Sequence, residues 1–409
     1  MGGIGKSTMK VLIADKFEKT GIDKMQQLGC EVALDPQLSG ESLIAAIKEH
    51  EPDILVVRST RVEKPMIEAG SELSLIIRAG SGFNTIDVET ASARGVYVAN
   101  CPGMNSVAVA ELVFGLMLSL DRRIAHNVND LREGTWNKAE YSKARGLKGS
   151  TLGVVGLGMV GKEVVARAAA FEMRVLYYDV VSHPELEERY GLEKVSLHDL
   201  LKQSDWVTLH VPLAEGTRHL IDESNLRLMK PSAHLINTSR GEVIDEQALA
   251  RALSEGWIAG AGLDVYEQEP STAKGEFTDP VTTFKGLYGT HHIGASTEQA
   301  QTAVADEVVR IVRAYVDSGD VPNCVNLEKG DIDSHVLILR HYNKPGVLAF
   351  VCGELNKANV NVQETRNSVL AGAKTCCAQI HLESEPPAET LERIRNHELV
   401  LSTRVVLLK

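Results

Sequence analysis

The first hundred residues alternate short, almost continuously apolar runs with segments of helical spacing. The apolar runs are KVLIAD, DILVVRS, LSLIIRAG and GVYVAN, and the helical segment ESLIAAIKEH follows the first of them. Near-continuous apolar runs are typical of strands buried on both faces of a parallel sheet. The alternation therefore predicts βαβ units that form a doubly wound lobe.

A long helix and a second alternating block follow. Apolar residues recur at helical spacing from about Ser106 to about Asn127, which predicts one continuous helix. Beyond a polar segment come the runs TLGVVGLGMVG, RVLYYDV, WVTLHVP, AHLINTS and IAGAGLDVY. We therefore expect an α/β fold with two doubly wound lobes, one flavodoxin-like and one Rossmann.

The pattern changes after the segment VPNCVNLEKGDIDS. The last 75 or so residues read strand, helix, strand, strand, helix, strand, which is the order of a ferredoxin-like βαββαβ unit. We expect this tail to form a separate module.

The amino-acid composition and the net charge limit which classes of protein and of partner are compatible with this chain. The chain has 409 residues, 44% of them hydrophobic and 24% charged, and its net charge is −12, which argues against nucleic acid or an anionic membrane as a main partner. The six cysteines form no disulfide framework and no metal-ligand spacing. Without a secretion signal or an apolar run long enough to span a bilayer, we expect a cytoplasmic protein.

The start, MGGIGKST, resembles a phosphate-binding loop. Such a loop needs a glycine four residues ahead of Gly5-Lys6-Ser7 and a strand before it, and this sequence has neither. We interpret residues 1–8 as a polar extension without a function.

A stronger motif is GLGMVG, from Gly156 to Gly161. It directly follows the predicted strand TLGVV and opens the predicted helix KEVVARAAAF, the context that a dinucleotide-binding turn requires. The glycines Gly156, Gly158 and Gly161 permit the tight turn, and the pyrophosphate would meet free N–H groups at the helix start.

Asp179 ends the next predicted strand, 23 residues after Gly156. A carboxylate at that distance bonds the adenosine ribose hydroxyls and repels the 2′-phosphate of NADP. Because no Arg or Lys follows in DVVSH, the sequence predicts NAD as the cofactor.

Three further motifs, NTSRGEVID, LDVYEQEP and HHIGAST, follow in order. Together with the glycine turn they resemble the D-2-hydroxyacid dehydrogenase family from about Lys10 to Val325. The resemblance implies a catalytic set of Arg240, Glu269 and His292, with His291 as the structural neighbour.

Elementary chemistry agrees with these roles. A histidine takes and returns a proton near neutral pH, a glutamate orients its ring, and an arginine offers a planar fork to the substrate. The resemblance also implies a substrate-binding domain of residues 9–104 and 297–326 and an NAD-binding domain of residues 105–296.

The resemblance implies further contacts to the cofactor, at Met159, Val160, His210, Pro212, Thr217, Thr238 and Asp264. Asp264 is favoured as a partner of the nicotinamide carboxamide, with a loop-organising role as the alternative. For the substrate carboxylate the resemblance implies the backbone of Ser81 and Gly82, in RAGSGFNTID. The family commonly has Val-Asp where this chain has Phe83-Asn84.

Arg58 and Arg61 follow a predicted strand end, where ligands bind in open α/β sheets. Two guanidinium groups there suit a phosphorylated substrate, and a solvated surface pair is the alternative.

The tail (333–409) resembles an ACT domain, a module that binds amino acids. Family members with such a tail oxidise D-3-phosphoglycerate to 3-phosphohydroxypyruvate and are often inhibited by L-serine. The resemblance implies His341, Asn343 and Asn361 as serine-binding residues, although Asn343 is also a good turn residue. It also implies a homotetramer. The alternatives are a glyoxylate or hydroxypyruvate reductase and, from another class, an NAD-sensing corepressor.

Overall fold

The computed structural model describes residues 8–270, 275–327 and 335–407, so most of the segment MGGIGKST lies outside the described residues. The chain forms two compact units, residues 1–326 and 327–409. No helix in the described ranges is long and apolar enough to cross a membrane.

The first sheet of unit one has five parallel strands in the order β2-β1-β3-β4-β5. This is the flavodoxin-type order, as predicted. The strands are β1 (Lys10–Ile13), β2 (Glu31–Leu34), β3 (Ile54–Val57), β4 (Leu75–Arg78) and β5 (Tyr97–Asn100). Every residue of β3 is buried, as expected for a strand covered on both faces.

Helices cover both faces of this sheet. One face packs against helices that follow the first strands in the chain: α2 (Gly40–His50), α3 (Lys64–Ala69) and α4 (Val88–Ala93). The other face packs against α1 (Lys19–Gln27) and α13 (Glu298–Ser318). The chain therefore returns to its first sheet near the end of unit one.

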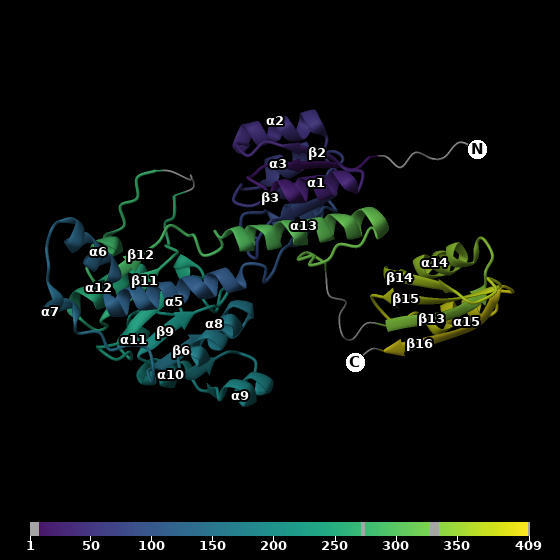
Figure 1. Cartoon of the computed structure of the whole chain (residues 1–409). Coiled ribbons are helices and arrows are strands. Elements are labelled where there is room, and N and C mark those ends of the chain that lie inside the picture. Colours follow the sequence, from purple (N-terminus) through teal and green to yellow (C-terminus); the bar gives the residue numbers. More distant parts are fainter. Residues whose placement is uncertain (1–7, 271–274, 328–334, 408–409) are drawn as a thin grey trace. The chain divides into compact units, whose positions relative to one another are not determined.

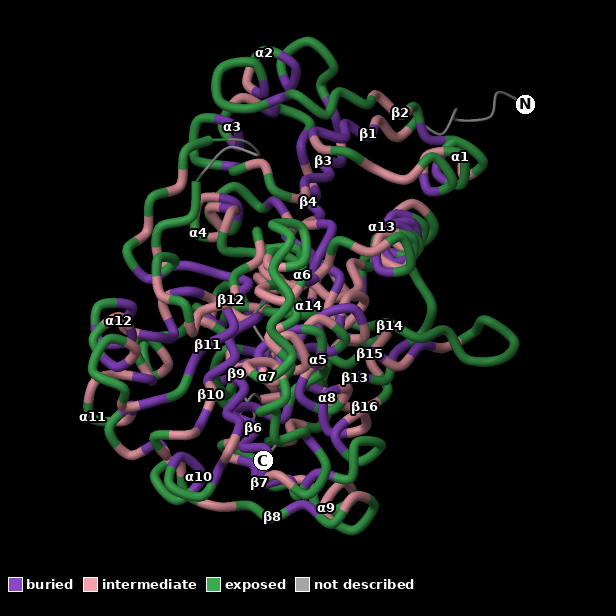
Figure 2. The backbone as a smooth tube through the Cα atoms, turned by 60° about the vertical axis from the view of Figure 1, so that its left-hand side comes forward, coloured by how far each residue is buried: buried purple, intermediate pink, exposed green. Residues whose placement is uncertain are grey.

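The second sheet has seven parallel strands in the order β12-β11-β10-β9-β6-β7-β8. Figure 1 labels β12, β11, β9 and β6 among them. They are β6 (Thr151–Val155), β7 (Arg174–Tyr178), β8 (Glu193–Lys194), β9 (Trp206–Leu209), β10 (His234–Asn237), β11 (Gly260–Leu263) and β12 (Leu287–Gly289). All residues of β6, β9 and β11 are buried, and Figure 2 shows buried residues concentrated along the central strands.

Two layers of helices enclose the second sheet. On one face lie α5 (Ser106–Arg122), α8 (Met159–Ala170) and α9 (Pro184–Tyr190). On the other lie α10 (Leu197–Gln203), α11 (Glu223–Leu226) and α12 (Glu246–Glu255). Two 3₁₀ turns, η1 (Gly241–Val243) and η2 (Pro280–Thr283), complete this lobe.

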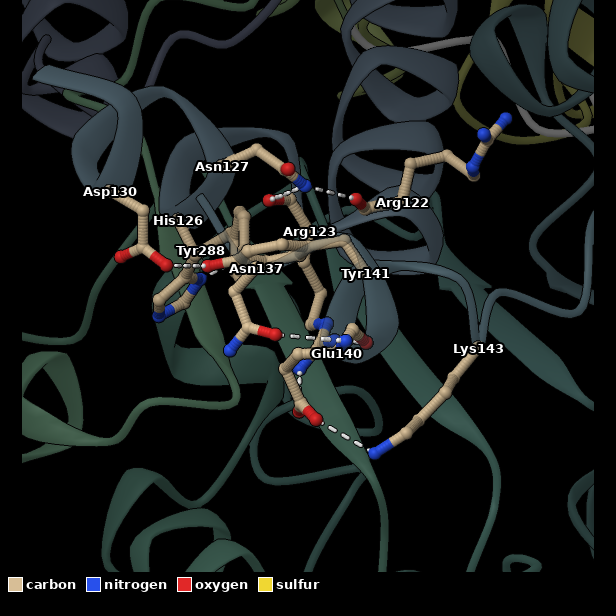
Figure 3. A network of polar contacts seen from close by, with 10 residues as sticks. All are labelled: Arg122, Arg123, His126, Asn127, Asp130, Asn137, Glu140, Tyr141, Lys143 and Tyr288. Carbon is tan, nitrogen blue, oxygen red and sulfur yellow. Dashed lines mark hydrogen bonds and ion pairs between the residues drawn. The ribbon is translucent and has the colours of Figure 1, made fainter. Parts of the chain in front are cut away.

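The continuous helix predicted over 106–127 was wrong, because the helix breaks at Arg123. Arg123 has a left-handed backbone (φ 48°) between α5 and α6 (Ile124–Arg132). Its guanidinium reaches α7 (Lys138–Tyr141), where Nη1 donates to Glu140 Oε1 at 2.8 Å and the cation lies over the Tyr141 ring (Figure 3). Apolar spacing continues across the break, so it gave no sign of these polar contacts.

Unit two is a four-stranded antiparallel sheet in the order β14-β15-β13-β16. Its elements are β13 (His335–Tyr342), α14 (Val347–Lys357), β14 (Val362–Val369), β15 (Thr375–Leu382), α15 (Ala388–Arg395) and β16 (Val400–Leu407). The βαββαβ order is as predicted. Residues of both helices pack with the sheet into a core of this unit's own.

Candidate active site

The glycine turn after β6 has the geometry of a dinucleotide-binding loop. Gly156 has φ 91°, and a Cβ there would lie 2.6 Å from the carbonyl oxygen of His210. A Cβ on Gly161 would lie 2.3 Å from the carbonyl oxygen of Gly156, so this glycine lets α8 approach the strand. Around Gly158, the N-cap of α8, no described atom lies within 4 Å of that position. The first and last glycines serve the fold, and the middle one leaves room for a ligand.

Asp179 lies directly beside this turn. Its Oδ2 accepts a hydrogen bond from Leu157 N at 2.7 Å, and its Oδ1 accepts one from Val181 N at 2.9 Å. Burial works against ionisation, but these two N–H groups hold the pKa of Asp179 below its ordinary value. The residue therefore presents a carboxylate at the place predicted for ribose recognition.

Of the other predicted cofactor contacts, Met159 and Val160 are the first residues of α8. The remaining ones lie beyond the ends of β9, β10 and β11. Burial lowers the pKa of His210 to about 3, which keeps its ring neutral. Thr217 donates to the carbonyl oxygen of Pro212 at 2.5 Å and so closes the loop after β9. The hydroxyl of Thr238 is buried and has no hydrogen-bond partner among the described residues. Buried hydroxyls are normally bonded, so Thr238 fits a residue that a ligand completes.

Glu269 and His292 are in contact. Nδ1 of His292 donates to Glu269 Oε2 at 2.7 Å, while Glu269 Oε1 accepts from Tyr266 N at 3.1 Å. Burial would raise the pKa of Glu269, but His292, Tyr266 N–H and the charge of Arg240 together lower it. The histidine side chain is half exposed, so its other ring nitrogen is available to a substrate.

Asp264 organises the loop that carries this histidine. The carboxylate is buried and accepts hydrogen bonds from Thr290 Oγ1 at 2.6 Å, Ile293 N at 2.8 Å and Gly294 N at 2.8 Å. Its carbonyl oxygen accepts from His292 N at 2.8 Å. These contacts match the loop-organising alternative, and the contact of Asp264 with the nicotinamide stays a prediction.

Arg240 faces the first lobe. A Cβ on Gly82 would lie 2.1 Å from Nη2 of Arg240, so the guanidinium rests against the backbone of Gly82. Next to it, the Ser81 hydroxyl donates to Asn105 Oδ1 at 2.7 Å, and Asn100 Nδ2 donates to the Ser81 carbonyl oxygen at 2.6 Å. The structure thus brings the predicted catalytic arginine and the predicted carboxylate loop together.

The sequence interpretation missed Arg78, the last residue of β4. Its Nε donates to the carbonyl oxygen of Arg58 at 3.0 Å. Burial, then the charges of Arg240 and Arg58, lower the pKa of Arg78 to about 10. Asp15 holds the neighbouring loop by accepting from the backbone N–H of Arg58 at 2.7 Å. A charged residue that ends the apolar run LSLIIR was the available signal.

The charges of Arg58 and Arg240 both act on Arg78, and we refer to these three residues as the arginine cluster. The predicted partner Arg61 is exposed. Like charges repel, so a cluster of this kind favours an anionic ligand.

In unit two, His341 is buried and both of its ring nitrogens face oxygen atoms. Nδ1 lies 2.8 Å from the Tyr342 carbonyl oxygen, and Nε2 lies 3.2 Å from Asn367 Oδ1. Asn343 donates its side-chain amide to the Ala373 carbonyl oxygen at 3.0 Å, which suits a turn residue. Asn361 is exposed. Serine binding by these residues stays a prediction.

The described residues can be compared with the needs of two classes of ligand, a metal ion and a dinucleotide. No group of three or more His, Cys, Asp or Glu side chains there lies in an arrangement that could hold a metal ion. The open position at Gly158, the Thr238 hydroxyl and the Asp179 carboxylate all fit a dinucleotide.

Comparisons with known proteins also indicate an NAD-binding protein. Residues 114–294 match the family described as D-isomer specific 2-hydroxyacid dehydrogenase, NAD binding domain. The chain is 40% identical over 326 residues to a glyoxylate reductase of Thermococcus litoralis, covering 78% of this chain and 96% of that one. It is 36% identical over 375 residues to a D-3-phosphoglycerate dehydrogenase of Archaeoglobus fulgidus, covering 90% and 69%.

Among solved structures, D-lactate dehydrogenase from Aquifex aeolicus, complexed with NAD and lactic acid, is similar with a TM-score of 0.66 and 29% identity. The similarity covers 76% of this chain and 96% of that one. The glycine turn, the His292–Glu269 pair and these matches lead to one conclusion. The chain belongs to the D-isomer specific 2-hydroxyacid dehydrogenase family and is an NAD-dependent oxidoreductase.

Proposed function

We propose that this enzyme oxidises D-3-phosphoglycerate to 3-phosphohydroxypyruvate, the first step of phosphorylated serine synthesis. The observation that carries the proposal is the cluster of Arg58, Arg78 and Arg240. Among the described charges that act on Arg78, Asp15 is the one carboxylate, so a phosphate and a carboxylate on one small substrate would balance the remaining positive charge. Guanidinium groups also match both anions through paired hydrogen bonds.

Each residue of the site has its own role in the proposed reaction. The turn at Gly156–Gly161 and Asp179 would hold NAD, which would supply the acceptor for the hydride from C2. His292 takes the hydroxyl proton at Nε2, since its Nδ1 is bonded to Glu269. Glu269 fixes the tautomer and the direction of the ring. Arg240 binds the carboxylate together with the backbone of Ser81 and Gly82.

Two further observations support the proposal. The match to the D-3-phosphoglycerate dehydrogenase of A. fulgidus covers 90% of this chain, so it extends past residue 326 into unit two. The packing of α13 on the first sheet supports a substrate-binding domain of residues 9–104 and 297–326 around an NAD-binding domain of residues 105–296.

A competing function is reduction of glyoxylate or hydroxypyruvate. The relative from T. litoralis bears that name, and the match covers nearly its whole length. Both functions would use the same catalytic pair, Glu269 and His292. The arginine cluster must therefore decide which substrate the enzyme prefers.

The test measures NADH oxidation with 3-phosphohydroxypyruvate, hydroxypyruvate and glyoxylate, in the wild type, Arg58→Ala and Arg61→Ala. We expect Arg58→Ala to lower kcat/KM for the phosphorylated substrate about 10–100-fold, the value of one or two charge-assisted hydrogen bonds. Activity on glyoxylate changes little, and the exposed Arg61 serves as the matched control. A wild type that prefers glyoxylate, or equal losses on all three substrates, contradicts the phosphate assignment.

We also propose feedback inhibition by L-serine, bound by His341, Asn343 and Asn361 between the tails of neighbouring subunits in a homotetramer. Such coupling requires at least a dimer, and serine binding must shift the assembly or closure of the enzyme reciprocally. Sedimentation of the enzyme with and without serine checks this, and a monomer that serine still inhibits contradicts it.

A further inference from the structure

Glu246, the first residue of α12, is a charged side chain that is only 9% exposed. Its Oε1 accepts a hydrogen bond from the backbone N–H of Glu267 at 2.8 Å. Glu267 stands two residues before Glu269, in the loop that follows β11. The contact therefore ties α12 to the segment that carries the partner of His292.

This segment is also in backbone contact with the loop of Arg240. A Cβ on Gly241 would lie 2.0 Å from the carbonyl carbon of Tyr266 and 2.4 Å from Glu267 N. Within the segment, Tyr266 N donates to Glu269 Oε1 at 3.1 Å. With so little space between the loops, a displacement of Glu267 moves both the proposed catalytic glutamate and the loop of the proposed catalytic arginine.

A second carboxyl group lies against Glu246. Asp279 is the N-cap of η2, where its Oδ1 accepts from Val281 N at 2.9 Å, and it lines the same cavity as Glu246, with its carboxyl within hydrogen-bonding reach of that of Glu246. Two carboxylates at this distance repel, and a hydrogen bond can form between them only when the pair holds one proton. Burial first, and then Asp279, raise the pKa of Glu246 to about 8, although the Glu267 N–H acts in the opposite direction.

The other charged groups around the pair do not neutralise it. The carboxylate of Glu267 is hydrogen-bonded to His219 Nε2. Arg251 and Glu276 line the same cavity as the pair, but the guanidinium of Arg251 forms an ion pair with Glu223 at 2.8 Å. Burial, with the charges of Asp264 and Glu246, raises the pKa of the Tyr266 hydroxyl to about 12, so this group stays neutral.

We propose that Glu246 and Asp279 share one proton, and that the protonated pair is a positioning device that holds the Glu267–Glu269 segment so that Glu269 stays on His292. The inference rests on the proposed roles of Glu269 and His292 and adds to them. Loss of the shared proton leaves two adjacent carboxylates, which separate and release the Glu267 N–H. Turnover then falls at alkaline pH without loss of NAD binding.

A simpler role for Glu246 is to stabilise the start of α12, since acidic residues favour helix N-termini. That role affects stability alone. It predicts no change in the pH dependence of kcat, so the two roles are separable.

The test is the pH profile of kcat for NAD reduction, with D-3-phosphoglycerate as substrate, or with D-glycerate if the wild type prefers it. In this direction His292 must be neutral, so activity rises with pH, and the fall above pH 8 belongs to the pair. Glu246→Gln keeps an acceptor for Glu267 N–H and a donor for Asp279, and needs no shared proton. We expect this variant to lose the alkaline fall and keep the wild-type KM for NAD.

Glu246→Ala removes the acceptor, so we expect kcat to drop about tenfold at all pH values while the KM for NAD stays constant. Glu276→Gln, which removes a charge from the same cavity, should keep the wild-type profile. An alkaline fall that persists unchanged in Glu246→Gln overturns the proposal. An active His292→Asn enzyme would instead overturn the proposed catalytic roles.

Thermal stability gives a second readout that does not need turnover. The folded state binds the shared proton more tightly than the unfolded chain, so the wild type loses stability as pH rises from 4.5 to about 8. Glu246→Gln should lose less over this window. Parallel curves for the two proteins contradict the shared proton.

Discussion

His292 combines an unusual backbone with a well-supported side chain. Its φ of 52° is left-handed, which costs energy in a residue other than glycine. The contacts of Asp264 to Thr290, Ile293 and Gly294 compensate for this cost by holding the loop around it. His291, the adjacent residue, is exposed.

The pair of histidines allows a matched prediction. Asn tolerates a left-handed backbone, so His292→Asn should fold normally and lower kcat about 10²–10⁴-fold. Binding of NADH, measured by fluorescence titration, should stay within about twofold. His291→Asn should behave as the wild type. Equal losses in the two variants would show that the proton acceptor is wrongly assigned.

At the residue scale, the sequence predicted the candidate functional residues that lie within recognisable motifs. It missed those that come together only when the chain folds. Arg240, Glu269 and Asp179 stand in recognisable motifs. In the structure the charge of Arg240 acts on Glu269, and Asp179 lies beside the glycine turn. Arg78 stands in an ordinary strand, and only the pairing of β3 with β4 brings it beside Arg58. Arg61 stands in the same predicted loop as Arg58 and is exposed.

At the scale of elements, the turn between β6 and α8 contains glycines that are needed for two different reasons. Gly161 is required by packing, since any Cβ would meet the carbonyl oxygen of Gly156. Gly158 has free space around it in the protein alone. The same residue type should therefore give opposite results when it is replaced.

We expect Gly158→Ala to leave the melting temperature of the cofactor-free protein nearly unchanged and to weaken NADH binding at least about tenfold. Gly161→Ala should lower the melting temperature by about 3–10 °C because of overpacking. Calorimetry without ligand and fluorescence titration with NADH measure the two effects. A Gly158→Ala protein that binds NADH normally would place the pyrophosphate elsewhere.

Elements were predicted best where burial is complete. The strands β3, β6 and β9 are buried throughout, and their apolar runs showed them clearly. The edge strand β2 was missed because none of its residues is fully buried, which leaves a weak apolar signal. The break at Arg123 was missed for a different reason, since its cause is the contact with Glu140 far along the chain.

For the whole molecule, the separate core of unit two is the main feature. Its helices α14 and α15 pack on their own sheet, through residues such as Val351, Leu355 and Ile394. His341 is part of this folded interior, whereas Asn361 is exposed. Replacing the exposed residue therefore tests serine binding without disturbing the unit.

If L-serine inhibits the wild type, Asn361→Ala should abolish or strongly weaken inhibition in the full-length enzyme. Basal kcat and the melting temperature should not change, because this side chain is exposed. Asn356→Ala, at an exposed position of α14, is the matched control and should stay sensitive. Inhibition that survives in Asn361→Ala removes this residue from the proposed effector site.

A unit with its own hydrophobic core can also be gained or lost as a whole during evolution. Recombination that adds or removes residues 327–409 leaves both sheets of the dehydrogenase intact, since none of their strands comes from that segment. The match to the T. litoralis relative covers 96% of that protein but 78% of this chain, so this chain carries residues outside the match. Natural selection could then change how the activity is controlled while leaving the chemistry alone.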